Sequence, residues 1–168
     1  PSFSGDNSII TFISSSTDLV SGDTNGVDDA FVSNKTTGSI TRVSVATDGT
    51  QGDGAVWRTR ISGNARYVVF ESTATNLVPG DVNGAADIFV HDLQTSTTEI
   101  VSLMHDGSIS PDGAAHPEIS ADGRYVVFSS NAALVPADTN NESDGYVRDR
   151  QLGTTELVSL ADNESVGN

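Results

Sequence analysis

The sequence contains no cysteine, which excludes disulfide bonds, thiolate metal sites and cysteine nucleophiles. It also lacks a run of about 18 apolar residues, so no segment is expected to insert into a membrane. Basic residues are scarce, because 8 Lys+Arg stand against 23 Asp+Glu and the formal net charge is −15. A chain this acidic is not expected to bind nucleic acid through its phosphates.

Patterns typical of helices are absent as well. No apolar stripe at helical spacing extends over three turns, and short β-branched and aromatic runs recur instead between clusters of turn residues. Hydrophobic residues make up 36% of the 168 residues, and the chain has 16 glycines, so a core can form. The composition predicts an all-β globular protein.

Three copies of one unit make up the chain. Marker residues recur 58 positions apart, namely Ser4, Ser62 and Ser120 and, eight residues later, Phe12, Phe70 and Phe128. In the second copy, turn residues separate four predicted strands, of which the first ends at residues 61–62 and the others cover 66–70, 87–91 and 98–103. A two-residue turn at 64–65 is expected to join the first two strands. Pro1 and Pro117 are expected to open the first strands of their copies.

Four antiparallel strands per unit are typical of a β-propeller blade. A parallel β-helix has shorter coils, and a β-sandwich does not repeat its sequence. The sequence therefore predicts three four-stranded antiparallel blades of about 58 residues, over residues 1–57, 58–116 and 117–168. Propellers generally need four to eight blades. We therefore expect a portion of a longer propeller, or a protomer whose end blades are covered by an identical chain.

The repeated pattern also resembles a known family. It reads P-x-[IF]-S-x-D-G-R-Y-V-V-F-x-S, then L-V-P-x-D-x-N, then D-[IG]-[FY]-V-x-D, over essentially the whole chain. This pattern is similar to the TolB-like, or WD40-like, β-propeller repeats of exported bacterial and archaeal proteins. The resemblance implies a propeller fold and an extracellular, cell-surface or periplasmic location. The first copy departs most, because Ser33 stands where the others have His91 and Arg148.

The loop between the second and third strands of each copy carries a motif for cation binding. All three loops fit D-x-N-[GN]-x-x-D, over residues 23–29, 81–87 and 138–144. Alternate carboxylate and amide oxygens on a tight turn are the ligands that Ca²⁺ prefers. The fourth position needs left-handed backbone, which Gly26, Gly84 and Asn141 tolerate. The predicted side-chain ligands are Asp23, Asn25, Asp29, Asp81, Asn83, Asp87, Asp138, Asn140 and Asp144, and the predicted carbonyl ligands are Val27, Ala85 and Glu142.

An alternative interpretation of these loops needs no metal. Asp and Asn side chains often accept hydrogen bonds from their own backbone in tight turns. Three copies in phase favour calcium over this alternative. The third loop is expected to be the weakest site, because it has Asn141 for glycine and one residue fewer upstream.

The sequence gives little support for catalysis. It has no nucleophile elbow, zinc-protease motif or phosphate loop. The histidines His91, His105 and His116 do not share one position in the repeat. Trp57 and His116 are expected to occupy equivalent positions before the first strands of the second and third copies, and Trp57 is expected to pack between blades rather than to form a platform for sugars.

We therefore expect a non-enzymatic, calcium-stabilised propeller that serves as a scaffold or interaction surface of an exported protein. Its expected partners are neighbouring blades or identical chains, with which it would assemble end to end. Two alternatives remain at this point. One is a propeller domain accessory to a hydrolase domain outside this segment, and the other is a propeller that binds carbohydrate or peptide.

Overall fold

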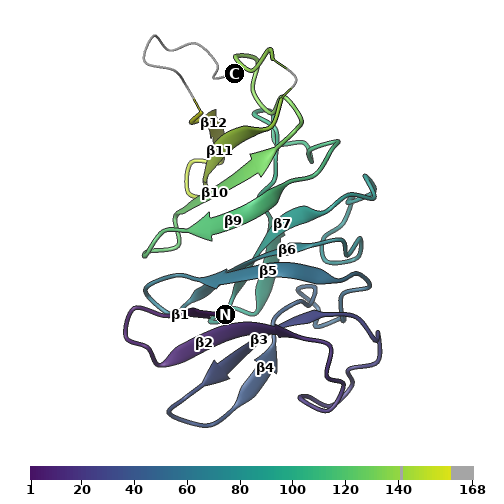
Figure 1. The fold of residues 1–168 in the computed structure, drawn as a ribbon, viewed down its shortest axis with the longest axis vertical. Helices are drawn as coiled ribbons and strands as arrows, with labels where there is room; N and C mark the ends of the chain where they lie inside the picture. Colours follow the sequence, from purple (N-terminus) through teal and green to yellow (C-terminus); the bar gives the residue numbers. More distant parts are fainter. Residues whose placement is uncertain (141, 160–168) are drawn as a thin grey trace.

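The computed structural model describes residues 1–140 and 142–159, which form three β-sheets stacked one on another (Figure 1). Each sheet has four antiparallel strands in sequence order. The first sheet contains β1 (Ser2–Phe3), β2 (Ile9–Ser14), β3 (Asp29–Asn34) and β4 (Ile40–Arg42). The second contains β5 (Val56–Ile61), β6 (Tyr67–Ser72), β7 (Asp87–Asp92) and β8 (Thr97–Ile100), and the third contains β9 (Ala115–Ile119), β10 (Tyr125–Ser130), β11 (Asp144–Asp149) and β12 (Thr154–Leu157). The predicted all-β class and four-stranded unit are confirmed.

The sheets start slightly earlier than the predicted blade boundaries. β5 begins at Val56 and β9 begins at Ala115, so boundaries after residues 57 and 116 fall inside these strands. Pro117 lies third in β9 and does not open it. A proline is tolerated there because β9 pairs with β10 alone, and because the register shifts opposite it, between Val127 and Ser129.

The hairpin between β5 and β6 is wider than the predicted two-residue turn. The amide of Ser62 donates to the carbonyl of Tyr67, and the amide of Ala65 donates to the carbonyl of Ser62. Ala65 adopts a φ of 61°, and Gly123 at the same place in the third sheet has a φ of 77°. The turn therefore needs one left-handed residue, a conformation that glycine adopts without a steric penalty.

Two hydrophobic clusters fill the spaces between successive sheets. The first joins residues of the first two sheets, including Val43, Phe70 and Phe89. The second joins the second and third sheets, including Phe128 and Tyr146. The second sheet thus packs both faces against neighbours, as a blade inside a propeller does, whereas the first and third sheets each pack one face.

Backbone hydrogen bonds also tie successive sheets together. Gly5 donates to the carbonyl of Gly63 at 2.9 Å, and Asn64 donates to the carbonyl of Ala121 at 2.8 Å. A Cβ added at Gly5 would lie 2.8 Å from that carbonyl oxygen, so this contact requires glycine. The strands β1, β5 and β9 come together along one side of the molecule as a result (Figure 1). Among the described residues, no helix has the length and hydrophobicity needed to cross a membrane.

Candidate functional site

Each of the three predicted cation loops carries two buried aspartates, and the second of them opens the third strand of its sheet. Asp29, Asp87 and Asp144 are the first residues of β3, β7 and β11. Asp23, Asp81 and Asp138, six residues earlier, are also buried. Because burial removes water from a carboxylate, each pair needs hydrogen bonds and a balancing charge or proton.

The asparagine of each loop serves the turn. Its Oδ1 accepts the amide two residues later, at 3.2 Å in Asn25–Val27, 2.8 Å in Asn83–Ala85 and 2.9 Å in Asn140–Glu142. The Nδ2 groups of Asn25 and Asn83 donate to Oδ2 of Asp29 and Asp87, at 3.1 and 2.7 Å. The loop asparagines therefore form the side-chain-to-backbone hydrogen bonds that the metal-free interpretation predicts. Gly26 and Gly84 have the predicted left-handed backbone, with a φ of 68° each, whereas Asn141 lies outside the described residues.

A serine after the fourth strand holds the second aspartate of every loop. The hydroxyls of Ser44, Ser102 and Ser159 donate to Oδ1 of Asp29, Asp87 and Asp144, at 2.5, 2.6 and 2.5 Å. Sequence reasoning missed these serines. Their signal was a Val-Ser pair that recurs with the spacing of the repeat, in a chain where serine is common.

In the first loop, the guanidinium of Arg42 lies beside both aspartates. The Nη1 of Arg42 lies 3.3 Å from Oδ1 of Asp23 and 3.6 Å from Oδ2 of Asp29. The Nε2 of Gln51 donates to the same oxygen of Asp23 at 3.0 Å. Because a guanidinium already balances this pair, the residues of the first loop do not fit a divalent cation.

The third loop has a hydroxyl donor in place of the arginine. Tyr146 stands where the other sheets have Phe31 and Phe89, and its hydroxyl donates to Oδ2 of Asp138. Burial, together with this hydrogen bond, raises the pKa of Tyr146, so the phenol stays protonated. The Oδ2 of Asp144 is buried and has no hydrogen-bond partner among residues 1–140 and 142–159.

In the second loop, neither an arginine nor a tyrosine stands at the equivalent positions. Ile100 and Ile109 stand where the first sheet has Arg42 and Gln51. Asp81 is only 4% exposed, and its Oδ1 has no hydrogen-bond partner within the described part of the chain. Burial and the neighbouring charge of Asp87 raise the pKa of Asp81 to about 6.

The same environment raises the pKa of the second aspartate, Asp87, and a surface hollow reaches the first, Asp81. Burial raises the pKa of Asp87, against the hydrogen bonds from Ser102 and Asn83. A hollow of about 670 Å³ has Asp81 in its wall, beside Pro79 and Val82. Solvent ions can therefore reach the neighbourhood of Asp81.

The donor set is small. Within the described ranges, no group of three or more His, Asp or Glu side chains is placed to hold a metal ion. An ion at the second loop would be held by the carboxylates of Asp81 and Asp87. Main-chain carbonyls and water, both ordinary ligands of Ca²⁺, would have to supply the rest.

The histidines and Trp57 lie elsewhere. His91 is buried in β7, where its Nδ1 lies 2.9 Å from Oγ1 of Thr98 and burial lowers its pKa. Trp57 is 58% exposed, so the expectation that it packs between blades is wrong. The repeat spacing of 58 also makes Arg58, and not Trp57, equivalent to His116.

Comparison with known proteins agrees with this architecture. No family model matches the chain, and no curated protein sequence is significantly similar to it. TolB from Acinetobacter baumannii has a similar structure, with a TM-score of 0.56 at 19% identity over 94% of this chain and 31% of that one. The β-propeller domain of the Trilobed protease from Pyrococcus furiosus has a TM-score of 0.57 at 12% identity, over 94% of this chain and 40% of that one.

The chain has the β-propeller fold of TolB-like proteins. The fold that the sequence resemblance implied is therefore confirmed, and the three sheets are propeller blades. The tricorn protease is a further structural neighbour, with a TM-score of 0.55 at 14% identity over 95% of this chain and 12% of that one. The chain spans less than half of each of these proteins, and the likeness concerns the fold.

Proposed function

We propose that this chain is the blade-forming part of a propeller that acts by binding, and that a divalent cation at Asp81 and Asp87 stabilises its second blade. The supporting observation is the buried Oδ1 of Asp81, which has no hydrogen-bond partner among the described residues. Calcium is the best candidate, because it accepts a few carboxylate oxygens together with carbonyls and water. The carbonyl of Ala85 remains a candidate ligand. Asn83 would have to give up its turn contact to become one.

The three loops are unequal in this proposal. The second loop is the primary site. The third loop is a weaker one, because Tyr146 already donates to Asp138, while one oxygen of Asp144 has no partner in the part of the chain that the structure describes. The first loop is left out, since Arg42 lies between its aspartates. The cation here has a structural role, because the bound ion balances charge that otherwise opposes folding in a chain of net charge −15.

A binding role suits the rest of the molecule better than catalysis does. Propellers present loops at both ends of a rigid stack of blades, and many work as scaffolds. The second aspartate of each loop accepts a hydrogen bond from a serine, and Nδ1 of His91 lies 2.9 Å from Oγ1 of Thr98. Neighbouring blades, identical chains or a protein ligand are the proposed partners. A periplasmic or cell-surface location is proposed from the family resemblance.

Calcium titration by calorimetry of the chelator-treated protein tests the cation site. We expect saturable binding that Asp81→Asn weakens at least tenfold, whereas Asp23→Asn in the first loop leaves it unchanged. Equal binding by all three proteins would place the ion elsewhere. No heat and no calcium-dependent change in melting would reject the cation site.

A further inference from the structure

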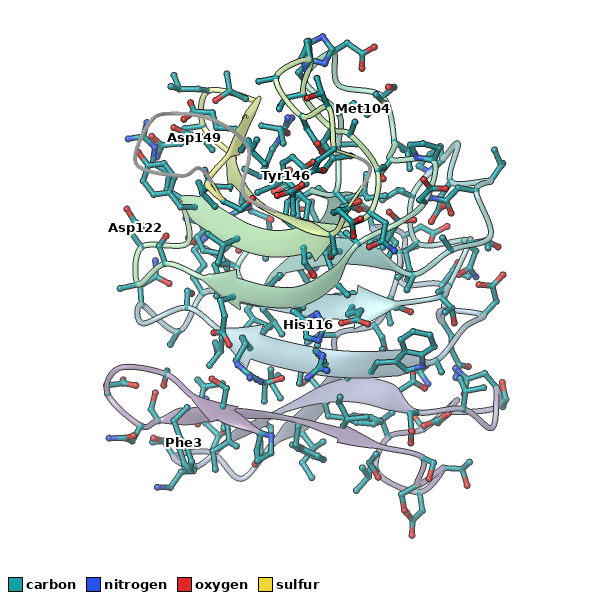
Figure 2. The ribbon with its side chains drawn as sticks, turned by 45° about the horizontal axis from the view of Figure 1, so that its top comes forward. Phe3, Met104, His116, Asp122, Tyr146 and Asp149 are labelled. Atoms are coloured by element: carbon teal, nitrogen blue, oxygen red, sulfur yellow. The ribbon has the colours of Figure 1, made fainter. Side chains whose placement is uncertain are left out.

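A cleft lies between the second and third blades, beside the loops that carry Asp87 and Asp144. It has a volume of about 300 Å³, and its wall includes Trp57, Glu71, Asp112, His116, Ser129 and Asn131. Figure 2 shows His116 at the junction of the two blades. The volume is at the lower end of the range for small-ligand sites, which suits one or two small rings.

The residues of this cleft depart from the repeat. Glu71 stands where the first and third blades have Ile13 and Ser129, and Trp57 stands where the third blade has Ala115. Glu71 is only 3% exposed, so a charged side chain is buried in a strand where the repeat also accepts an aliphatic one. The propeller fold therefore does not require these side chains, and their grouping in one cleft points to a ligand.

Glu71 also holds a strained residue of the next blade. His116 has a φ of 59°, a left-handed conformation that is unfavourable for a residue with a side chain. Its amide donates to Oε2 of Glu71 at 3.0 Å, and its Nδ1 lies 3.2 Å from the hydroxyl of Ser129. No partner occupies its Nε2 among the described residues, so this nitrogen remains for a ligand. Unlike the left-handed Ala65, which closes a hairpin turn, His116 lies within β9, and left-handed residues of this kind cluster at functional sites.

The chemistry of the cleft favours a neutral ligand with many hydroxyl groups. Trp57 exposes 58% of its surface and offers an aromatic face for stacking. The carboxylates of Glu71 and Asp112 accept hydrogen bonds, while the amide of Asn131 both donates and accepts them. Hydroxyl groups of a ligand can act as donors and as acceptors, so they can pair with all three side chains. The Nε of Arg58 lies 3.4 Å from Oε2 of Glu71, so the buried charge is already balanced and a cationic ligand would gain little.

From these observations we propose that the cleft binds a neutral carbohydrate. One sugar ring stacks on Trp57, and its hydroxyl groups form hydrogen bonds with Glu71, Asp112 and Asn131. This site uses none of the aspartates themselves, whereas Ala86 and Ser143 of the same loops lie in its wall. Titrations in calcium and in excess chelator keep the two proposals separate.

Trp57 makes the test direct, because it is the only tryptophan of the chain. Its fluorescence is measured during titration with neutral trisaccharides of glucose, galactose, mannose, xylose and N-acetylglucosamine, after a glycan array with the labelled protein. We expect a saturable change with at least one sugar. Calorimetry with the same sugar then compares Trp57→Ala and Asp112→Asn with the control Phe3→Ala, an exposed aromatic on β1 outside the cleft.

The proposal requires that both cleft variants weaken binding at least tenfold and that Phe3→Ala does not. Asp112→Asn replaces an exposed side chain, so we expect the fold to be unchanged and the buried Glu71 to stay in place. Absence of binding to every neutral glycan on the array overturns the proposal. Binding that survives in Trp57→Ala also overturns it, as does a response to a lysine-containing peptide and to no sugar.

Discussion

The loops of the first and second blades share a backbone but differ in how their buried charge is balanced. Both have two aspartates, an asparagine that holds the turn and a serine on the second aspartate. Only the first has a guanidinium between the carboxylates, from Arg42, where the second has Ile100. The comparison shows that the repeat determines the geometry of the loop, whereas single residues outside the motif determine whether it needs an ion.

The largest effect on stability is expected when Arg42 of the first blade is replaced by isoleucine, which is the residue at that position of the second blade. Arg42→Ile removes the guanidinium beside Asp23 and Asp29, and an uncompensated buried carboxylate pair costs about 3–5 kcal/mol of unfolding free energy. Urea unfolding in excess chelator measures this loss, and calcium should restore part of it. Arg60→Ala, which breaks the exposed pair with Glu118, is the control and should cost less than about 1 kcal/mol.

Removing one charge from the second blade should have the opposite sign. In chelator, Asp81→Asn relieves the repulsion between Asp81 and Asp87, so we expect the unfolding free energy to rise by about 1–3 kcal/mol. The matched variant Asp23→Asn should lower it, because Arg42 loses a partner. Chemical unfolding of both variants checks the signs. Destabilisation by Asp81→Asn in chelator would show that the second pair is balanced by a group of the protein.

Placing a guanidinium in the second blade should have a smaller effect on stability. Ile100→Arg places an arginine at the register position of Arg42, opposite Phe89 in β7. We expect about 1 kcal/mol of stabilisation in chelator, because the new ion pair offsets the loss of a partly buried isoleucine. Calcium should then add little further stability. A calcium response equal to that of the unmodified protein would contradict the role given to Arg42.

The smallest effect is expected at the acid end of the pH range, outside the aspartate loops. The hydrogen bonds from Arg124 lower the pKa of Asp149 to about 2, below its ordinary value of 3.8. The ionised form is thus favoured in the folded state, so its contribution is present above pH 4 and is lost as the pH falls through 2. Replacing Arg124 by Gln should lower stability at neutral pH, and the difference from the unmodified protein should vanish once the pH is below 2. Urea unfolding at several pH values measures it.

The blade architecture could be predicted from the sequence because the repeat is regular. The spacing of 58 residues and the turn residues were enough for the number and order of strands. The hairpin turns and the position of Pro117 were predicted less well, because a bulge and a left-handed residue depend on pairing between strands.

The aspartate pairs were also predictable, since each pair belongs to one short motif. The contact from Arg42 to Asp23 was not, because the two residues lie 19 positions apart and no other copy repeats the arginine. The same holds for Tyr146, which looks like an ordinary core aromatic until its hydroxyl is placed beside Asp138. Such departures from a repeat are a signal that sequence reasoning can use.

Thermal unfolding with and without calcium tests the central claim most directly. The unmodified protein, Asp81→Asn and Asp23→Asn are melted in a few millimolar calcium and in excess chelator at equal ionic strength. If calcium binds the folded state at 100 times its Kd, it adds about 2.7 kcal/mol, which raises the Tm by about 5–10 °C. We predict this rise for the unmodified protein and for Asp23→Asn, and its loss in Asp81→Asn. Superimposable curves with and without calcium for the unmodified protein would contradict a cation at the second loop.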